Sequence, residues 1–239
     1  MGRRKFAAMK PRVSHQKTAA LTLVEVLVVV FVITLLLAMF LPALAKARRR
    51  GGHISCANDV KQVELAFRIW ASDNHGKYPM EISTANGGTM ELAARGDVVA
   101  TFQIMSNELS TPRVLICPED TNHIFATNFS GAFSAKNISY FIGIDASTNL
   151  PRAFLSGDDN FESRGMPVKQ GLFTIWTNTP IAWNSSRHVA VETRFWLFST
   201  KTSFGYIGLG DGSVQQLNNF DLLNQVRQTG LATNRLAIP

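Results

Sequence analysis

The sequence predicts an α+β fold in which one long N-terminal helix packs on a small antiparallel sheet. Residues 26–45 form an uninterrupted apolar run, and residues 56–70 place apolar side chains on one face of a helix. Short apolar runs separated by turn residues follow from residue 114 onward. The helix is therefore expected to have a membrane half and an amphipathic half, and the remaining chain is long enough for one domain with its own core.

The membrane half is predicted from Leu21. Val26 to Ala45 is a run of twenty residues without a charge, and a helix of that length measures roughly 30 Å, enough to cross a bilayer core. Thr34 is its only polar residue, whereas a core helix of a soluble domain would show a polar face. Glu25 lies just inside the apolar segment that begins at Leu21, where a carboxylate costs about 2.5–3.5 kcal/mol if it reaches the bilayer centre. A helix that serves only as an anchor does not need this carboxylate. The alternative interpretation is that Glu25 lies near the membrane surface and extends its side chain toward the lipid headgroups.

The amphipathic half follows a kink expected at Pro42. The helix is predicted to reach Arg50 and then Gly51-Gly52, a pair that can end a helix or act as a joint. Apolar residues at spacings of three and four then form one face, which we expect to pack on the domain core: Cys56, Val60, Val63, Phe67 and Trp70.

The later elements are short. Helices are expected at residues 89–95, 97–109 and 220–229, and strands at 114–117, 138–144, 153–155, 172–176, 204–209 and 213–217. Residues 157–160 are predicted as a turn, and the tail to Pro239 as loose. Gly210-Asp211-Gly212 is expected to join the last two strands in a tight hairpin.

The charge of the chain argues against nucleic-acid binding. Of the formal net charge of +7, six units belong to basic residues before residue 20, so +1 remains for the rest. No basic patch interleaved with aromatic residues remains to follow a phosphate backbone. The glycine-rich phosphate-binding templates are also absent, and no cofactor is predicted.

Two cysteines, Cys56 and Cys117, permit one disulfide in an oxidising compartment. The alternative is that both are buried free thiols. Because the membrane segment indicates export, we favour the bridge, which would link a helix start to a strand end.

Residues 18–45 resemble the N-terminal segment of type IV pilins and type II secretion pseudopilins. In that family a basic leader precedes a peptidase site, and the processed helix has Thr at its second position and Glu at its fifth. With a chain beginning at Leu21, Thr22 and Glu25 match, and Pro42 matches a recurrent proline. Ala20, where glycine normally precedes the cut, and Leu21, where Phe or Met usually follows, depart from the pattern.

Residues 56–80 are similar to pilin-like proteins from planctomycete and verrucomicrobial genomes, which share a Cys-x-Asn-x-x-Lys-Gln opening. His188 and Asp211-Gly212 are similar to a His…Asp-Gly feature near the C-terminus of such proteins. We interpret the Asp-Gly pair as a structural turn, because glycine adopts positive φ without strain.

The resemblance implies a fibre subunit and no enzyme activity. Residues 1–20 would be a basic prepilin leader, 21–50 a transmembrane and assembly helix, and 51–239 a periplasmic or extracellular pilin-like domain. A prepilin peptidase would cut between Ala20 and Leu21 and N-methylation of Leu21 would follow. Glu25 would pair with the new amine of a neighbouring subunit. The partners would be other pilin or pseudopilin subunits, the peptidase and an inner-membrane assembly platform, with the N-terminus cytoplasmic and the domain periplasmic.

Three other interpretations of the N-terminus remain open. A secretory signal peptide could be cut after Ala43-Leu44-Ala45, releasing a soluble protein from Lys46. An uncut anchor could hold a periplasmic binding or sensing domain that never polymerises. Met9 is a second possible start, which would shorten the leader.

Candidate catalytic and metal-binding residues do not form a convincing set. Cys117, His188 and Asp211 could be drawn as a nucleophile triad, but a disulfide would consume the thiol. Asp158, Asp159 and Asp211 match no calcium loop. The other histidines show no ligand spacing, so no zinc site is predicted: His15, His53, His75 and His123.

Overall fold

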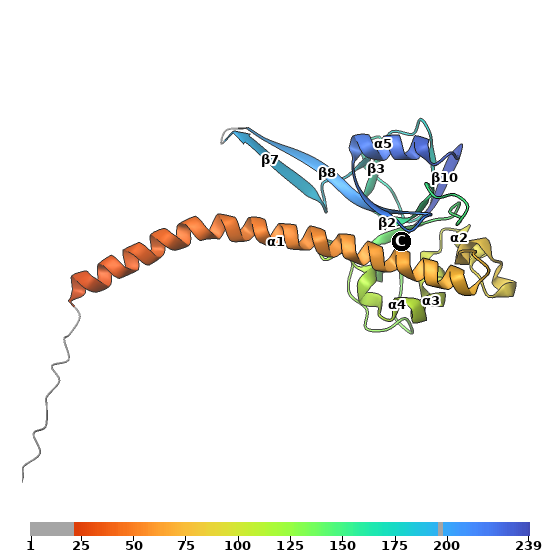
Figure 1. Cartoon of the computed structure of the whole chain (residues 1–239), viewed down its shortest axis with the longest axis horizontal. Coiled ribbons are helices and arrows are strands. Elements are labelled where there is room, and N and C mark those ends of the chain that lie inside the picture. The colour runs from red at the N-terminus through yellow and green to blue at the C-terminus, as the bar shows by residue number, and fades with distance from the viewer. Residues whose placement is uncertain (1–21, 196–197) are drawn as a thin grey trace, which may run out of the picture. The chain divides into compact units, whose positions relative to one another are not determined.

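The computed structural model describes residues 22–195 and 198–239, and its longest element is helix α1, Leu23–Asp73 (Figure 1). The chain divides into two compact units, Met1–Ala47 and Arg48–Pro239. This division falls within α1, close to the predicted boundary at residues 50 and 51. The predicted leader, residues 1–20, and the expected first processed residue, Leu21, lie outside the described residues.

The described part of the first unit is the apolar half of α1. Large apolar side chains along it are exposed, for example Leu23 at 80%, Phe31 at 63% and Leu44 at 69%. By length and composition α1 contains a segment that could cross a membrane. Exposing apolar side chains to water is unfavourable in free energy, so this half of α1 is favoured in an apolar surrounding.

The second unit is built on a seven-stranded antiparallel sheet, in the order β5-β10-β1-β2-β8-β7 with β9 also paired to β8 (Figure 1). Its strands are β1 (Tyr140–Gly143), β2 (Phe154–Asp158), β5 (Gly171–Trp176), β7 (Val189–Phe195), β8 (Phe198–Leu209), β9 (Val214–Asn218) and β10 (Thr233–Ile238). The long strand β8 pairs with β7 through its first half and with β2 and β9 through its second.

The second half of α1 covers one face of this sheet. Its buried hydrophobic residues, at spacings of three and four, are Cys56, Val60, Val63, Ala66, Phe67, Trp70 and Ala71. They join one core cluster with Tyr140, Ile142 and Tyr206 of the sheet. The intervening strand residues Phe141 and Ile207 point to the opposite face, as the two-residue period of a strand requires.

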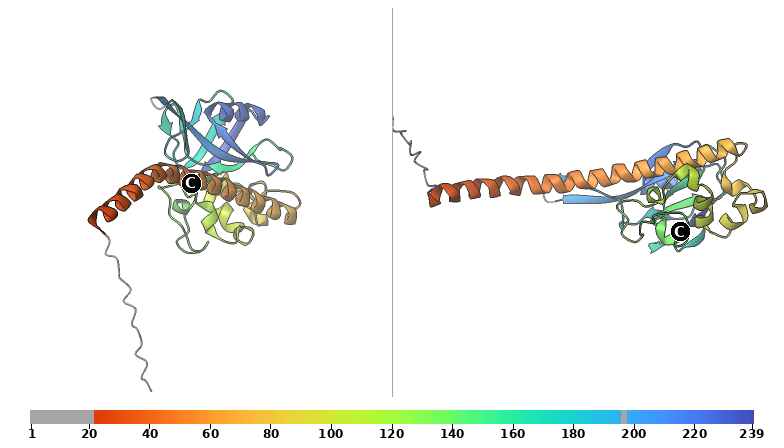
Figure 2. Two further views of the ribbon diagram at one scale, coloured as in Figure 1. Left: turned by 60° about the vertical axis from the view of Figure 1, so that its left-hand side comes forward. Right: turned by 90° about the horizontal axis from the view of Figure 1, so that it is seen from below.

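Helix α5 (Asn219–Gln228) and a three-stranded sheet cover that opposite face (Figures 1 and 2). The small sheet is formed by β3 (Phe161–Ser163), β4 (Met166–Pro167) and β6 (Ile181–Trp183). Leu222 and Val226 of α5 and Trp183 of β6 complete this second core cluster. The predicted α+β class, with a long N-terminal helix on an antiparallel sheet, is thus confirmed.

Short helices connect α1 to the sheet. They are α2 (Met90–Ala93), α3 (Val98–Ile104) and α4 (Ser106–Leu109), with single 3₁₀ turns at Pro79–Glu81, Thr84–Asn86, Pro112–Leu115 and Ala135–Asn137. Asp97 caps α3 by accepting hydrogen bonds from the backbone N–H groups of Val99 and Ala100. The helix predicted at 97–109 is therefore two helices, which meet at Met105.

Three predicted local elements are wrong. Residues 114–117 are not a strand, because Thr111 caps a 3₁₀ helix that starts at Pro112. Residues 157 and 158 belong to strand β2 rather than to a turn. The tail is not loose: β10 lies inside the sheet between β5 and β1.

Gly51-Gly52, a pair that can end a helix or act as a joint, does not end this one, since α1 continues through both residues. Gly52 has a packing reason instead. A Cβ at this position would lie 2.5 Å from Oε1 of Glu119, so only glycine lets the Glu119 carboxylate approach the helix this closely.

Candidate functional site

Thr22 and Glu25 close the first turn of α1 through reciprocal hydrogen bonds. Oε2 of Glu25 accepts from the backbone N–H of Thr22 at 2.8 Å and from its hydroxyl at 2.9 Å. The Thr22 hydroxyl oxygen accepts from the backbone N–H of Glu25 at 3.3 Å. This is a capping box, which satisfies N–H groups that have no partner within the helix. Glu25 therefore has a local role in starting α1.

The predicted processing site, Ala20 and Leu21, lies outside the described residues. At the third predicted assembly residue, Pro42, α1 is continuous.

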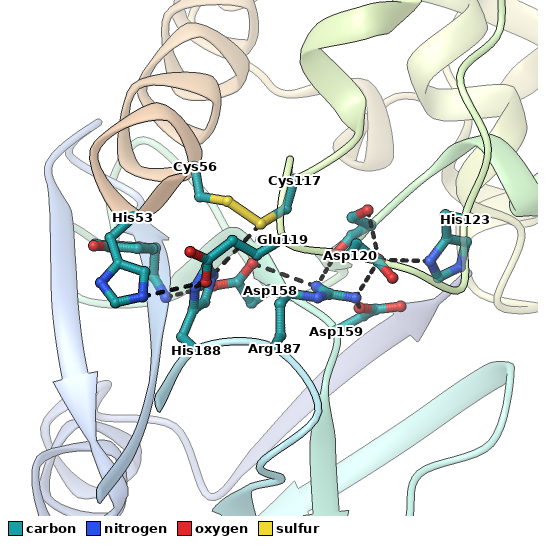
Figure 3. The surroundings of a disulfide bond; sticks show 12 residues. His53, Cys56, Cys117, Glu119, Asp120, His123, Asp158, Asp159, Arg187 and His188 are labelled. Atoms are coloured by element: carbon teal, nitrogen blue, oxygen red, sulfur yellow. Dashed lines mark hydrogen bonds and ion pairs between the residues drawn. A yellow bond between two sulfur atoms is a disulfide. The ribbon is translucent and has the colours of Figure 1, made fainter. Parts of the chain in front are cut away.

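Cys56 and Cys117 form a disulfide, as predicted. Both cysteines are fully buried, and the bond joins α1 to the segment that precedes Glu119 (Figure 3). His53 lies three residues before Cys56, and Glu119 two residues after Cys117, so the bond brings these two side chains to the same place.

The carboxylate of Glu119 lies between two imidazoles (Figure 3). Its Oε2 is 3.2 Å from Nε2 of His53 and 3.0 Å from Nδ1 of His188. The other ring nitrogen of His188, Nε2, is 3.3 Å from Oδ2 of Asp158 and 3.5 Å from Sγ of Cys117. His188 is fully buried, whereas the side chains of His53 and Glu119 are 20% and 18% exposed, so the group opens to solvent on one side.

Phe204 supports both imidazoles. The His188 ring stacks on it at a centroid distance of 5.3 Å, and the His53 ring meets its edge at 5.0 Å. Aromatic contacts of this kind restrict ring rotation as well as burying area. The orientations of His53 and His188 are therefore set by packing in addition to their bonds with Glu119.

Arg187 lies beside this group, in a cluster of three carboxylates. It pairs with Asp120, with Asp159 at 2.6 Å and with Asp158 at 3.4 Å, and it donates to the carbonyl oxygen of Ser139 at 3.0 Å. Its side chain is 4% exposed. A buried guanidinium requires such compensation, because an unpaired buried charge is strongly unfavourable.

Asp158 links the two groups. Its Oδ2 also accepts from the backbone N–H of Tyr206 at 2.7 Å. Burial alone would raise the pKa of Asp158, but the bonds with His188, Arg187 and Tyr206 lower it. Burial raises the pKa of Asp159 to about 6, despite the neighbouring Arg187.

The two imidazoles differ in their ionisation. Burial opposes protonation of His188, but the hydrogen bonds and charges of Asp158 and Glu119 outweigh it and raise its pKa. Burial lowers the pKa of His53, although Glu119 opposes this shift. At neutral pH the buried ring is thus the more basic of the two.

Among the described residues, no hydrogen bond or ion pair joins His188 to the Asp211-Gly212 pair. Asp211 is exposed and accepts from the backbone N–H of Ser213 at 2.8 Å, and Gly212 has φ +80°. Both belong to the turn between β8 and β9. The arrangement also excludes the nucleophile triad, because the sulfur of Cys117 is in the disulfide.

Sequence reasoning missed Glu119, Arg187 and the role of His53. A usable signal existed for two of them, because a bridge between Cys56 and Cys117 necessarily brings His53 near Glu119. Arg187 had no comparable signal, since its partners come from two separate segments, at Asp120 and at Asp158-Asp159.

Comparisons with the models of known protein families, with curated proteins and with solved structures found no match to this chain.

Proposed function

We propose that this chain is a structural subunit of a type IV pilus-like or type II secretion pseudopilus fibre. The observation that carries the proposal is the nature of α1, one helix with an exposed apolar half and a second half packed into a domain. In such a fibre the apolar halves of neighbouring subunits would pack on one another after leaving the membrane. The proposal also rests on the resemblance of residues 18–45 to prepilin segments.

In this proposal the N-terminus is cytoplasmic, the domain is periplasmic, and a prepilin peptidase cuts between Ala20 and Leu21. Glu25 would then pair with the new amine of a neighbouring subunit, since a carboxylate in an apolar surrounding persists when it is paired. The disulfide is consistent with an oxidising compartment outside the cytoplasm. Assembly, rather than catalysis, would be the function.

The capping box favours a second candidate. Thr22 already satisfies the Glu25 carboxylate in part within its own chain, so Glu25 needs no neighbouring subunit to explain its presence. The second candidate is a membrane-tethered periplasmic binding or sensing domain that does not polymerise.

Three variants separate the two roles of Glu25. Glu25→Gln removes the charge but keeps an acceptor that suits a capping box. Thr22→Ala removes the cap but keeps the charge, and Glu25→Ala removes both. The measurement is the fraction of the protein in fibres sheared from cells, compared with the fraction that stays in the membrane.

The fibre proposal expects Glu25→Gln and Glu25→Ala to lose assembly while both remain in the membrane, and Thr22→Ala to keep most of it. If Glu25→Gln assembles normally and only the two cap-breaking variants are impaired, the intersubunit role is excluded. The mass and first residue of the native protein give an independent test: a chain beginning at N-methylated Leu21 supports processing, and one beginning at Lys46 contradicts it.

A further inference from the structure

We propose that His53, Glu119 and His188 form a binding site for a divalent transition-metal ion, with zinc as the best match. The site lies within the second unit and does not depend on the proposed fibre function. It departs from the sequence prediction, which found no zinc site because the three residues are far apart along the chain.

The donor set is of the right kind. Two imidazole nitrogens and one carboxylate oxygen are ligands that zinc takes in tetrahedral sites that keep one position for water. Magnesium and calcium prefer oxygen ligands, so two imidazoles disfavour them.

The distances suit a small ion. One ring nitrogen of His53, one carboxylate oxygen of Glu119 and one ring nitrogen of His188 all lie within 4.8 Å of one another. Nε2 of His53 and Nδ1 of His188 are 3.2 and 3.0 Å from Oε2 of Glu119. Ligands at about 2.0–2.1 Å from a tetrahedral zinc ion stand roughly 3.3 Å apart, so both nitrogen–oxygen separations match this geometry to within a few tenths of an ångström.

Asp158 supplies the support that metal-bound histidines usually have. With Nδ1 of His188 facing the ion, its Nε2 faces Oδ2 of Asp158 at 3.3 Å. A carboxylate in this position fixes the ring orientation and increases the basicity of the ligand nitrogen. Asp158 is itself held by Tyr206 and Arg187.

The backbone of the site is also fixed. The disulfide ties the α1 segment that carries His53 to the segment that carries Glu119. Gly52 leaves room for the Glu119 carboxylate against the helix, and Phe204 packs on both imidazoles.

The site is open to solvent on one side. The partial exposure of His53 and Glu119 leaves an entry path and a position for a water ligand. The charge of Arg49 acts on His53 and opposes the ion, so the affinity should be below that of a site without a nearby cation.

The test uses the full chain in detergent, with its disulfide intact and its metals removed by a chelator. Zinc affinity and stoichiometry are measured by competition with a chromophoric chelator, and cobalt is added as a spectroscopic probe of tetrahedral coordination. The wild type is expected to bind one zinc ion per chain, and excess calcium is not expected to displace it.

Two ligand variants carry the test, because His53 and Glu119 are partly exposed and tolerate an amide of similar size. His53→Gln and Glu119→Gln should each lower the zinc affinity by more than about 10-fold. Gly52→Ala should lower it by roughly 10-fold, since the added Cβ displaces the Glu119 carboxylate. His75→Asn is the control, because His75 is exposed and outside the site.

The proposal is overturned if the wild type binds no zinc, or if both ligand variants bind it with wild-type affinity. If only His75→Asn lost zinc binding, the metal would bind at the exposed His75 instead of the proposed site, which would also overturn the proposal. Near-ultraviolet circular dichroism of each variant, recorded without zinc, verifies that the domain remains folded, so that a lost affinity reports the site.

Discussion

The hydroxyl of Ser156 on β2 donates a 2.6 Å hydrogen bond to Oε1 of Glu64, a fully buried carboxyl group on α1. The second oxygen of Glu64, Oε2, has no hydrogen-bond partner among the described residues. Gly208, opposite Ser156 on β8, makes room for this side chain, because a Cβ there would lie 1.9 Å from Oε1. The contact between α1 and the sheet thus contains a buried carboxyl group among mainly apolar side chains.

Glu64→Gln is expected to stabilise the domain at neutral pH. Burial raises the pKa of Glu64 well above its ordinary value of 4.5, so the folded state keeps a proton that the unfolded chain releases. A raised carboxyl pKa contributes stability that is complete below pH 4.5 and is lost as the pH rises toward the folded-state pKa. Glutamine resembles the protonated side chain and does not ionise, so the variant avoids this loss.

The measurement is the free energy of unfolding of the full chain in detergent between pH 4 and 8. The wild type should lose stability over this range relative to Glu64→Gln, whose slope should be flatter. Glu162→Gln, on strand β3, serves as the control and should follow the wild type. Parallel pH profiles for Glu64→Gln and the wild type would contradict a neutral Glu64.

Arg187→Met should destabilise the domain by about 3–5 kcal/mol at neutral pH, because it leaves three carboxylates without their buried cation. Arg235→Met is the matched control. Arg235 pairs with Asp145 at an exposed position, 46% for the arginine side chain, and such a pair contributes only about 0–1 kcal/mol. Denaturant unfolding of both variants checks the difference, and similar losses for the two would mean that Asp120, Asp158 and Asp159 do not depend on Arg187.

The sequence predicted the parts of the fold that depend on local pattern. The period of Cys56 to Trp70 indicated which face of α1 is buried, and the Asp211-Gly212 pair indicated the hairpin between β8 and β9. These signals lie within a few residues of one another, so no knowledge of the tertiary structure was needed.

The remaining features depend on contacts between distant segments. Arg187 and His188 contact residues of the segment after Cys117 and of the end of β2. No spacing rule connects these positions in the sequence. Gly51-Gly52 was interpreted as a pair that can end a helix or act as a joint, because glycine is usually unfavourable in helices. The close contact of Gly52 with Glu119 becomes visible only in three dimensions.

Reduction of the Cys56–Cys117 disulfide should destabilise the domain by about 4 kcal/mol, since the bond closes a loop with a sequence separation of 61 residues. The double variant Cys56→Ser and Cys117→Ser should show a similar loss without reductant. Adding a reductant should lower the unfolding free energy of the wild type and leave that of the double variant unchanged. An unchanged wild type, with both thiols shown to be reduced, would contradict a stabilising role for the bond.

Leu236→Ala tests the position of β10, the strand that the sequence predicted as a loose tail. Leu236 is fully buried in the second core cluster, and β10 pairs with β1 on one side and β5 on the other. Truncating a buried leucine costs about 2–5 kcal/mol, so the variant should lose that much stability in denaturant unfolding. Leu172→Ala, on the neighbouring strand β5, is the matched control, because Leu172 is 48% exposed and should cost less than about 1 kcal/mol. Equal and small losses for both variants would mean that residues 233–238 do not form an interior strand of the sheet.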